Sequence, residues 1–514
     1  MSANVKRGDA PAFFLELFTK ATWLRMIYPL NQRAPMLSVA ASFARPASAS
    51  VGPRRSARSG LRTKSIRAPM TAAASATLPE TVLDWEAISA ACHDTETGKK
   101  LAAEEALREK GEGLPHVTSK LRLFGHAEED VRVTLYRDHA GWCPYCQKLW
   151  MMFELKQIPY RIERINMRSY GEKPASFLKK VPSGLLPVVE LDGEIITESL
   201  VIMQILESTF PENCMLPEDG FDRANELLRL ERRLFSDWCG LVFRPGMPGP
   251  FGGGARKQFE ETLDAVDAGL GETEGPWFLG GDTPSIVDLQ YVSHIERMNA
   301  SCLYWKGLQL RGTERWANLE RWFLAFEELP CYHACKSDYY THVMDIPPQY
   351  GPGFSDNNDA TAEAQRVIDG ESWKLPLNLS AADLEPLPDS MNHGDEAARH
   401  EAAYRLAANA SAIAKFACRG MGEKGAKQYG APLADPTAVP NLKYEKKVDE
   451  MLRVTASLLL DGSAGESAGT TSAQGKEVAK CLAYLRDRVG VPRDMSYPAA
   501  MQLRAHLNYV MDAL

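Results

Sequence analysis

Hydrophobic and polar positions change period several times along the chain, and each change predicts an element. Apolar and polar residues alternate over Val131–Tyr136, as in a half-buried strand, and from Pro144 onward the apolar positions follow helical spacing. Farther along we expect a second strand at 160–166, a short helix at 174–180, a hairpin turning at Asp192-Gly193, and another helix. The predicted order is therefore strand, helix, strand, helix, hairpin, helix.

That order is the topology of the thioredoxin fold, and helical patterns lie on both sides of it. Ser285, followed three residues later by Asp288, forms a capping-box arrangement that opens an apolar helix. Tyr350–Ser390 is rich in Pro, Asp and Asn, which predicts little regular structure. The expected fold class is an α/β thioredoxin-like domain followed by an all-α domain and an extra C-terminal helical bundle. The boundaries that we expect are 1–77 for a leader, 78–129 for a helical preface, 130–211 for the thioredoxin-like domain, 222–345 for the all-α domain, 346–394 for a linker and 395–514 for a C-terminal extension.

The leader differs in composition from the rest of the chain. Residues 1–79 hold twelve Lys and Arg and two acidic residues, and no acidic residue lies between Lys20 and Pro79. Ser, Ala and Arg predominate, which is typical of an organelle transit peptide that starts at Met1 or Met36. We therefore expect a protein of the chloroplast stroma, with the mitochondrion as the alternative. The remaining chain is acidic, which argues against nucleic acid as a partner, and no run of about 18 apolar residues predicts a transmembrane segment.

Ten cysteines in 514 residues, only two of them as Cys-x-x-Cys, do not form the pattern of a disulfide framework. The pair is Cys143 and Cys146, in the stretch RDHAGWCPYC. A structural zinc ion needs four ligands, and this pair offers two. A second cluster is more simply explained by packed side chains than by a metal; it contains Cys331, His333, Cys335 and His342. We therefore expect no metal.

A reactive thiol is the better explanation of the Cys143 motif. Cys143 directly precedes a predicted helix whose first residue is Pro144. The free N–H groups and the positive end of the helix dipole would then face its sulfur and favour a thiolate. Cys146, about one helical turn farther on, would be placed to attack a mixed disulfide on Cys143. The residues alone are also compatible with two cysteines that have no chemical role.

Further motifs carry a resemblance to a known family. The sequence CPYC after a strand resembles a glutaredoxin, whereas SGLLPVVELDG at 183–193, then ITES at 196–199 and an all-helical region, resemble a glutathione S-transferase. The similarity is to the cysteine-type classes, namely omega, lambda and dehydroascorbate reductase, and it covers about residues 130–342. The preface and the C-terminal third lie outside it and resemble extensions of transferase-like proteins of plastids and cyanobacteria.

The resemblance implies which residues bind glutathione, the expected co-substrate: Tyr145, Arg168, Leu186, Pro187, Glu198 and Ser199. In the family, the bond that matches Leu186-Pro187 is cis, so that the backbone can pair with glutathione as an added strand would. Ser199 would receive the γ-glutamyl carboxylate at a helix N-terminus, and Glu198 would meet the amino group. Arg168 falls near the position where the omega class carries a cation beside the glycyl end of glutathione, although the spacing does not match closely. The capping box matches a structural element of the family's helical domain.

The family's conjugating members carry Tyr or Ser where this chain has Cys143, and a cysteine implies thiol transfer because it forms a disulfide with glutathione. We expect a glutathione-dependent thiol-disulfide oxidoreductase, with Cys143 and Cys146 catalytic, that acts on glutathionylated proteins or on small oxidised substrates such as dehydroascorbate. Its partners would be glutathione and a protein or small-molecule disulfide, and the resemblance implies a homodimer that the added segments could block.

A substrate pocket would be bordered by aromatic residues, although such residues at helical spacing are usually core: Trp238, Phe243 and Trp305. Two alternatives are a non-catalytic scaffold or binding module in the plastid and a glutathione-assisted isomerase.

Overall fold

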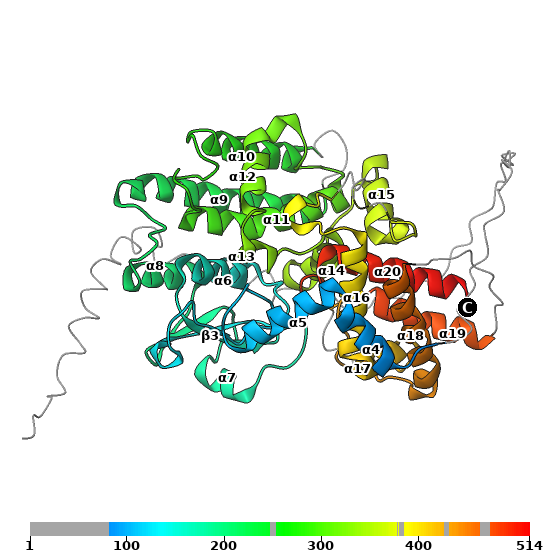
Figure 1. Cartoon of the computed structure of the whole chain (residues 1–514). Coiled ribbons are helices and arrows are strands. Elements are labelled where there is room, and N and C mark those ends of the chain that lie inside the picture. The colour runs from blue at the N-terminus through cyan, green and yellow to red at the C-terminus, as the bar shows by residue number, and fades with distance from the viewer. Residues whose placement is uncertain (1–81, 247–252, 378, 380–384, 426–430, 463–472) are drawn as a thin grey trace, which may run out of the picture. The chain divides into compact units, whose positions relative to one another are not determined.

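The computed structural model describes residues 82–514, apart from 247–252, 378, 380–384, 426–430 and 463–472 (Figure 1). The predicted leader, residues 1–77, lies outside the described residues. Everything described belongs to one unit of the chain, which spans Ser75–Leu514. None of the helices in the described part is long and apolar enough to cross a membrane.

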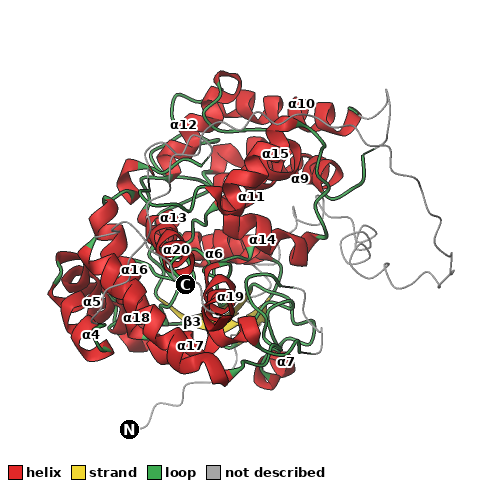
Figure 2. Ribbon diagram, turned by 90° about the vertical axis from the view of Figure 1, so that its right-hand side faces the viewer, coloured by secondary structure: helices red, strands yellow, loops and turns green. Residues whose placement is uncertain are grey.

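A single five-stranded sheet, small beside the helices (Figure 2), carries the α/β part of the fold. Its strand order is β1-β3-β2-β4-β5, with β1 at Leu121–Arg122, β2 at Val133–Asp138, β3 at Tyr160–Ile165, β4 at Val188–Leu191 and β5 at Glu194–Ile196. β2 and β3 are parallel, and every other pair is antiparallel. Asp192 and Gly193 both have positive φ in the β4–β5 turn, which a tight hairpin requires. The helices that follow the strands are α6 (Pro144–Lys156), α7 (Ala175–Lys180) and α8 (Ser199–Thr209). The thioredoxin-like part of the predicted fold class is confirmed.

The all-α domain packs around one central helix. Its helices are α9 (Phe221–Val242), α10 (Gly254–Leu270), α11 (Ile286–Lys306), α12 (Ala317–Phe326), α13 (Pro330–His333) and α14 (Tyr339–Tyr350). Almost every side chain of α11 is buried, because α6, α9 and α14 all pack against it. The capping box at its start is formed as predicted: the Ser285 hydroxyl accepts from the Asp288 N–H, and the Asp288 carboxylate accepts from the Ser285 N–H.

Two segments contain more regular structure than their sequence patterns predict. The preface forms α4 (Trp85–Asp94) and α5 (Glu96–Glu109), and it also adds strand β1 to the sheet. Two residues are too few to show an alternating pattern. In the linker, Asn358 caps α15 (Asp359–Arg366), and one π-helical turn at Val367–Glu371 follows. The Ala, Glu, Gln and Arg residues of α15 favour a helix, so the prediction of little regular structure over Tyr350–Ser390 was wrong here; packing against α11 supports the helix further.

The C-terminal extension packs on the rest of the fold rather than standing apart as the separate unit that its pattern suggests. It forms α16 (Asp395–Ala408), α17 (Ala410–Ala417), α18 (Glu445–Asp461), α19 (Ala473–Arg486) and α20 (Tyr497–Asp512). The preface helices α4 and α5 lie beside α16, as Figure 1 shows. A fully buried ion pair of 2.6 Å joins Arg504 of α20 to Asp338, the N-cap of α14. One hydrophobic core therefore runs through the extension and the all-α domain.

Candidate active site

The Cys-x-x-Cys motif occupies the turn between β2 and α6. Cys143 is the N-cap of α6 and Pro144 is its first residue, as the sequence predicts. The backbone N–H groups of Cys146 and Gln147 donate to the Cys143 carbonyl at 3.1 and 3.0 Å. Cys143 retains 7% of its surface in contact with solvent, whereas Cys146 retains 1%. The outer cysteine is therefore the one that a substrate can reach.

A buried carboxylate lies beside the two thiols. One carboxylate oxygen of Asp138 and the sulfurs of Cys143 and Cys146 all lie within 4.8 Å of one another. Oδ2 of Asp138 accepts from the N–H of Trp142 at 2.8 Å, while Oδ1 is buried without a hydrogen-bond partner among the described residues. Burial, and then the proximity of Cys143 and Asp138, raises the pKa of Cys146 well above its usual value. Cys146 therefore stays a neutral thiol at physiological pH.

Two buried cations flank the turn, and sequence reasoning found neither. Arg297 of α11 donates to the Trp142 carbonyl at 2.6 Å and to Oε1 of Gln147 at 2.8 Å. Lys148 of α6 donates to Gln290, and burial lowers its pKa to about 8. A basic residue within an apolar helix pattern was the only signal of Lys148 in the sequence, and Arg297 lies on a different element altogether.

The register of the sheet brings the predicted glutathione-binding segments to the edge that holds Cys143. Val188, which follows Leu186-Pro187, pairs with Tyr136 near the end of β2, and Ile196 of β5 pairs with Val189. The first residues of β4 and the last residues of β2, β3 and β5 therefore share one edge. The segments that extend from that edge contain the predicted residues Arg168, Leu186, Pro187, Glu198 and Ser199.

These residues differ in exposure and backbone geometry. The Leu186-Pro187 bond is cis, as the resemblance implies. Glu198 is exposed and has φ 68°, a strained value for a residue with a side chain, and such strain is often found where a ligand is held. Ser199 is half-buried in the first turn of α8, Tyr145 is half-buried, and Arg168 is exposed. Their roles in binding stay predictions.

The aromatic residues expected to border a substrate pocket are packed against one another. Trp238 is fully buried, and its ring N–H donates to the Ser301 hydroxyl at 2.8 Å. The ring of Phe243 stacks on Tyr350, with centroids 5.7 Å apart, and Tyr350 also contacts Trp238 at 5.3 Å. Trp305 is 6% exposed and leaves no room for a side chain at Gly353. Trp238 and Trp305 are therefore core residues, and Tyr350, the last residue of α14, packs against the cluster.

The second group of cysteines and histidines does not gather into a metal site. His342 contacts Glu296 at 2.7 Å, the Cys335 thiol donates to the Cys331 carbonyl at 3.2 Å, and His333 contacts the backbone of Glu327. Within the described ranges, the only group of three or more potential ligands is that of Asp138, Cys143 and Cys146. Those three are one ligand short of a closed structural zinc site.

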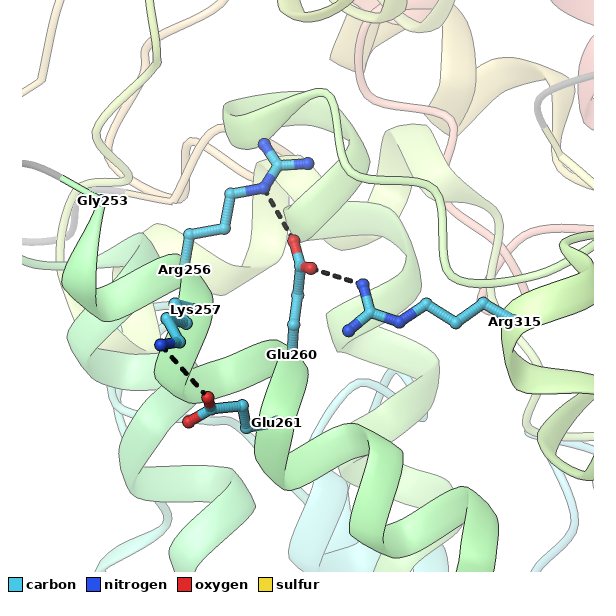
Figure 3. A pocket seen from close by; sticks show the side chains of 6 residues that line it. All are labelled: Gly253, Arg256, Lys257, Glu260, Glu261 and Arg315. Atoms are coloured by element: carbon cyan, nitrogen blue, oxygen red, sulfur yellow. Dashed lines mark hydrogen bonds and ion pairs between the residues drawn. The ribbon is translucent and has the colours of Figure 1, made fainter.

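A surface pocket on α10 contains none of the predicted site residues (Figure 3). Its charged side chains neutralise one another: Glu260 contacts Arg256 at 2.8 Å and Arg315 at 2.5 Å, and Lys257 contacts Glu261 at 3.6 Å. With its charges satisfied internally, this pocket is a weaker candidate for a ligand site than the turn at Cys143.

Replacing Asp345 with asparagine should reduce the pH dependence of stability. Asp345 lies behind the turn and accepts from the Tyr170 hydroxyl at 2.7 Å, and burial raises its pKa to about 7. The pKa of an Asp in the unfolded chain is about 3.9. At pH values between about 3.9 and the folded-state pKa, only the folded state keeps the proton on Asp345, so the free energy of unfolding falls as pH rises. Between about pH 5 and pH 8, deprotonation of Asp345 should lower the free energy of unfolding of the wild type by about 2 to 3 kcal/mol. Asp345→Asn should not show this decrease. Denaturant unfolding at the two pH values measures the difference; equal losses in both proteins would contradict it.

Comparison with known proteins identifies two family domains in the chain. Residues 142–209 match the model of the glutathione S-transferase N-terminal domain, and residues 222–325 match that of the C-terminal domain. Glutathione S-transferase omega-1 of Mus musculus is 28% identical over 42% of this chain and 84% of its own length. Glutathione S-transferase L3 of Arabidopsis thaliana is 31% identical over 33% of this chain and 67% of its own length. A solved structure, a dehydroascorbate reductase of Chlamydomonas reinhardtii, aligns with 22% identity and a TM-score of 0.33 over 40% of this chain and 93% of that one. The chain belongs to the glutathione S-transferase family.

Proposed function

We propose that this protein is a glutathione-dependent thiol-disulfide oxidoreductase with Cys143 as its nucleophile. The observation that carries the proposal is a cysteine at a helix N-terminus, at the sheet edge to which segments 186–187 and 198–199 also extend. The relatives are named as glutathione S-transferases, which supports glutathione as the thiol. Reducible substrates would include glutathionylated proteins and small oxidised molecules such as dehydroascorbate.

The residues at this edge fit glutathione. The β2–β4 ladder begins at Val188, so the main chain of Leu186 lies outside it and can pair with a peptide as an added strand does. Glu198 does not cap α8 with its side chain, which leaves the first-turn N–H groups at Ser199 for a carboxylate. The Glu198 carboxylate is exposed and can meet an ammonium group. A tripeptide with a carboxylate and an amine at one end matches these three features.

The proposed reaction has two thiol-disulfide exchanges. The Cys143 thiolate attacks the glutathionyl sulfur of a mixed disulfide, the old S–S bond breaks, and the substrate thiolate leaves and takes up a proton. A second glutathione, as its thiolate, then attacks the glutathionyl sulfur on Cys143. This step releases oxidised glutathione and returns Cys143 as the thiolate. One free glutathione is consumed for each mixed disulfide, because the other half of the oxidised glutathione comes from the substrate.

Cys146 is not needed in this cycle. Its pKa is raised well above the usual value by burial, so little of it is a thiolate that could attack. Glutathione from solution can reach the partly exposed Cys143 instead. We therefore propose a monothiol route, with Cys146 as a packed neighbour.

Peptide mass spectrometry after exposure to oxidised glutathione tests the proposal. Cys214 is a built-in control, because it is exposed and lies on the loop after α8, whereas Cys143 is largely buried. If exposure alone governed reactivity, Cys214 would be modified first. We expect oxidised glutathione to modify Cys143 before Cys214. Reduced glutathione should then remove the glutathionyl group from Cys143, and the protein should turn over a mixed disulfide. Preferential modification of Cys214, with no turnover of a mixed disulfide, would reject the proposal.

The composition of residues 1–77 supports the chloroplast stroma as the place where this activity operates, with the mitochondrion as the alternative. A fluorescent protein fused behind residues 1–77 tests this in plant cells. Fluorescence that stays in the cytosol would contradict both locations.

A further inference from the structure

The C-terminal extension reaches the residue that precedes the reactive cysteine. Trp142 is fully buried, and its ring N–H donates to the Val491 carbonyl at 2.9 Å. The guanidinium carbon of Arg493 lies 4.7 Å from the centroid of the Trp142 ring, within the range of a cation–π contact. Both partners belong to the loop 490–494 between α19 and α20, outside the region that the family models match.

The loop 490–494 is shaped to receive this ring. A Cβ atom at Gly490 would lie 2.5 Å from Cζ2 of Trp142, so the indole fills the space where a side chain would be. Asp494 accepts from the N–H of Gly490 at 2.8 Å and from Nε of Arg493 at 2.9 Å. These bonds hold the loop closed and fix the guanidinium over the ring.

The same loop is tied to the all-α domain. The N–H of Val491 donates to the Thr341 hydroxyl at 3.1 Å, and the Val491 carbonyl also accepts from the Ser337 hydroxyl. Both hydroxyls stand at the start of α14, where the buried Arg504–Asp338 pair also attaches the extension. The support behind Trp142 is therefore continuous with the protein core.

Each polar atom of Trp142 is held by a different part of the chain. Its N–H donates to Asp138 of β2 at 2.8 Å, its carbonyl accepts from Arg297 of α11 at 2.6 Å, and its ring N–H bonds to the extension. Trp142 is covalently joined to Cys143, so a shift of the indole moves the sulfur relative to the N–H groups of α6. Of these three contacts, the one with Val491 is made by the extension, and the other two are made by β2 and α11.

We infer that the extension positions the reactive thiol: loop 490–494, through Val491 and Arg493, holds Trp142 and thereby Cys143 at the N-terminus of α6. This inference rests on the proposed function for its catalytic meaning, but the geometry of the thiol can be tested without it. Trp142, Val491 and Arg493 are positioning residues, because they act on substrate only through Cys143. The loop would thus make the extension a part of the thiol site.

The test compares two substitutions with a matched control. Trp142→Phe removes the indole N–H but keeps an aromatic ring, and Arg493→Met removes the guanidinium but keeps the aliphatic chain. Arg419→Met is the control, since Arg419 lies over Phe416, also within the extension, at 5.0 Å and is half-buried. Melting temperatures establish that each variant is folded at the temperature of the assay.

The first measurement is the rate at which iodoacetamide alkylates Cys143 in the native protein, followed by peptide mass spectrometry with Cys214 as the internal standard. We expect both test substitutions to slow it by about tenfold, because a displaced thiol loses its alignment with the helix N-terminus. Arg419→Met should alkylate at the wild-type rate. Rates that are unchanged or faster in folded Trp142→Phe and Arg493→Met would overturn the inference.

The second measurement separates this inference from the proposed function. For mixed-disulfide reduction, we expect kcat to fall by about tenfold in both variants while KM for glutathione stays within about twofold, because the glutathione-binding segments are untouched. If the wild type reduces no disulfide, the proposed function fails and the alkylation rates still decide the inference. If the wild type is active and the variants keep their kcat, the inference fails alone.

Discussion

Replacing Cys143 with serine is expected to lower the rate of glutathione mixed-disulfide reduction by about a thousandfold or more. A serine hydroxyl does not ionise near neutral pH and cannot form the mixed disulfide through which the proposed reaction passes. Cys143 is the more accessible of the two thiols in the turn, so no other cysteine there can take its place. The measurement is steady-state turnover of a glutathionylated substrate, with oxidised glutathione counted as it forms.

Cys146→Ser is the matched control for that experiment. The Cys146 thiol is buried and its pKa is raised, so glutathione should resolve the intermediate without it and turnover should stay within about threefold of the wild type. A loss as large as that of Cys143→Ser would show an obligatory dithiol cycle. Turnover that persists in Cys143→Ser would remove this residue from the mechanism.

Replacing Asp288 with alanine should destabilise the protein by about 4 to 6 kcal/mol. The Asp288 carboxylate is fully buried and accepts four hydrogen bonds. The donors are the N–H and hydroxyl of Ser285, the N–H of Phe278 and the ring N–H of Trp322. Alanine leaves all four buried without a partner, and each costs about 1 to 3 kcal/mol. Equilibrium unfolding in urea measures the loss.

The exposed Asp282, which precedes the capping box in the same loop, provides the control. Asp282→Ala should change the free energy of unfolding by no more than about 0.5 kcal/mol. The folded fraction of Asp288→Ala should keep its kcat, because the box is structural and does not form part of the thiol turn. A loss below about 1 kcal/mol in Asp288→Ala would show that water or rearranged side chains satisfy these donors.

The fold could be predicted where its signals are local. Alternation over β2, helical spacing from Pro144 and the turn at Asp192-Gly193 each reflect contacts between residues a few positions apart. The same is true of the Ser285 box. Strand β1 was missed because it has two residues and depends on its pairing with β3. Helix α15 was missed because the Pro, Asp and Asn residues around it outweighed its own helix formers and its Asn358 cap.

Sequence patterns identified only the outer part of the candidate site. Cys143 and the segments at 186–187 and 198–199 could be recognised because they form motifs. The buried charges behind the turn could not, because Asp138, Arg297 and Asp345 belong to three elements that meet only on folding. Burial makes an unpartnered charge costly, so Arg297 and Asp345 take hydrogen-bond partners from distant parts of the chain, the Trp142 carbonyl and the Tyr170 hydroxyl.

By itself the sequence determined the identity of most elements of the thioredoxin-like part and the placing of Cys143 at the start of a helix, because backbone periodicity and capping act within one turn or one strand pair. Only the tertiary structure decided what surrounds that cysteine. Trp142 and Val491 are separated by 349 positions, and no spacing rule relates them. Close packing of a shared core brings them together, so the extension and the thiol turn meet at a contact that neither segment's sequence predicts.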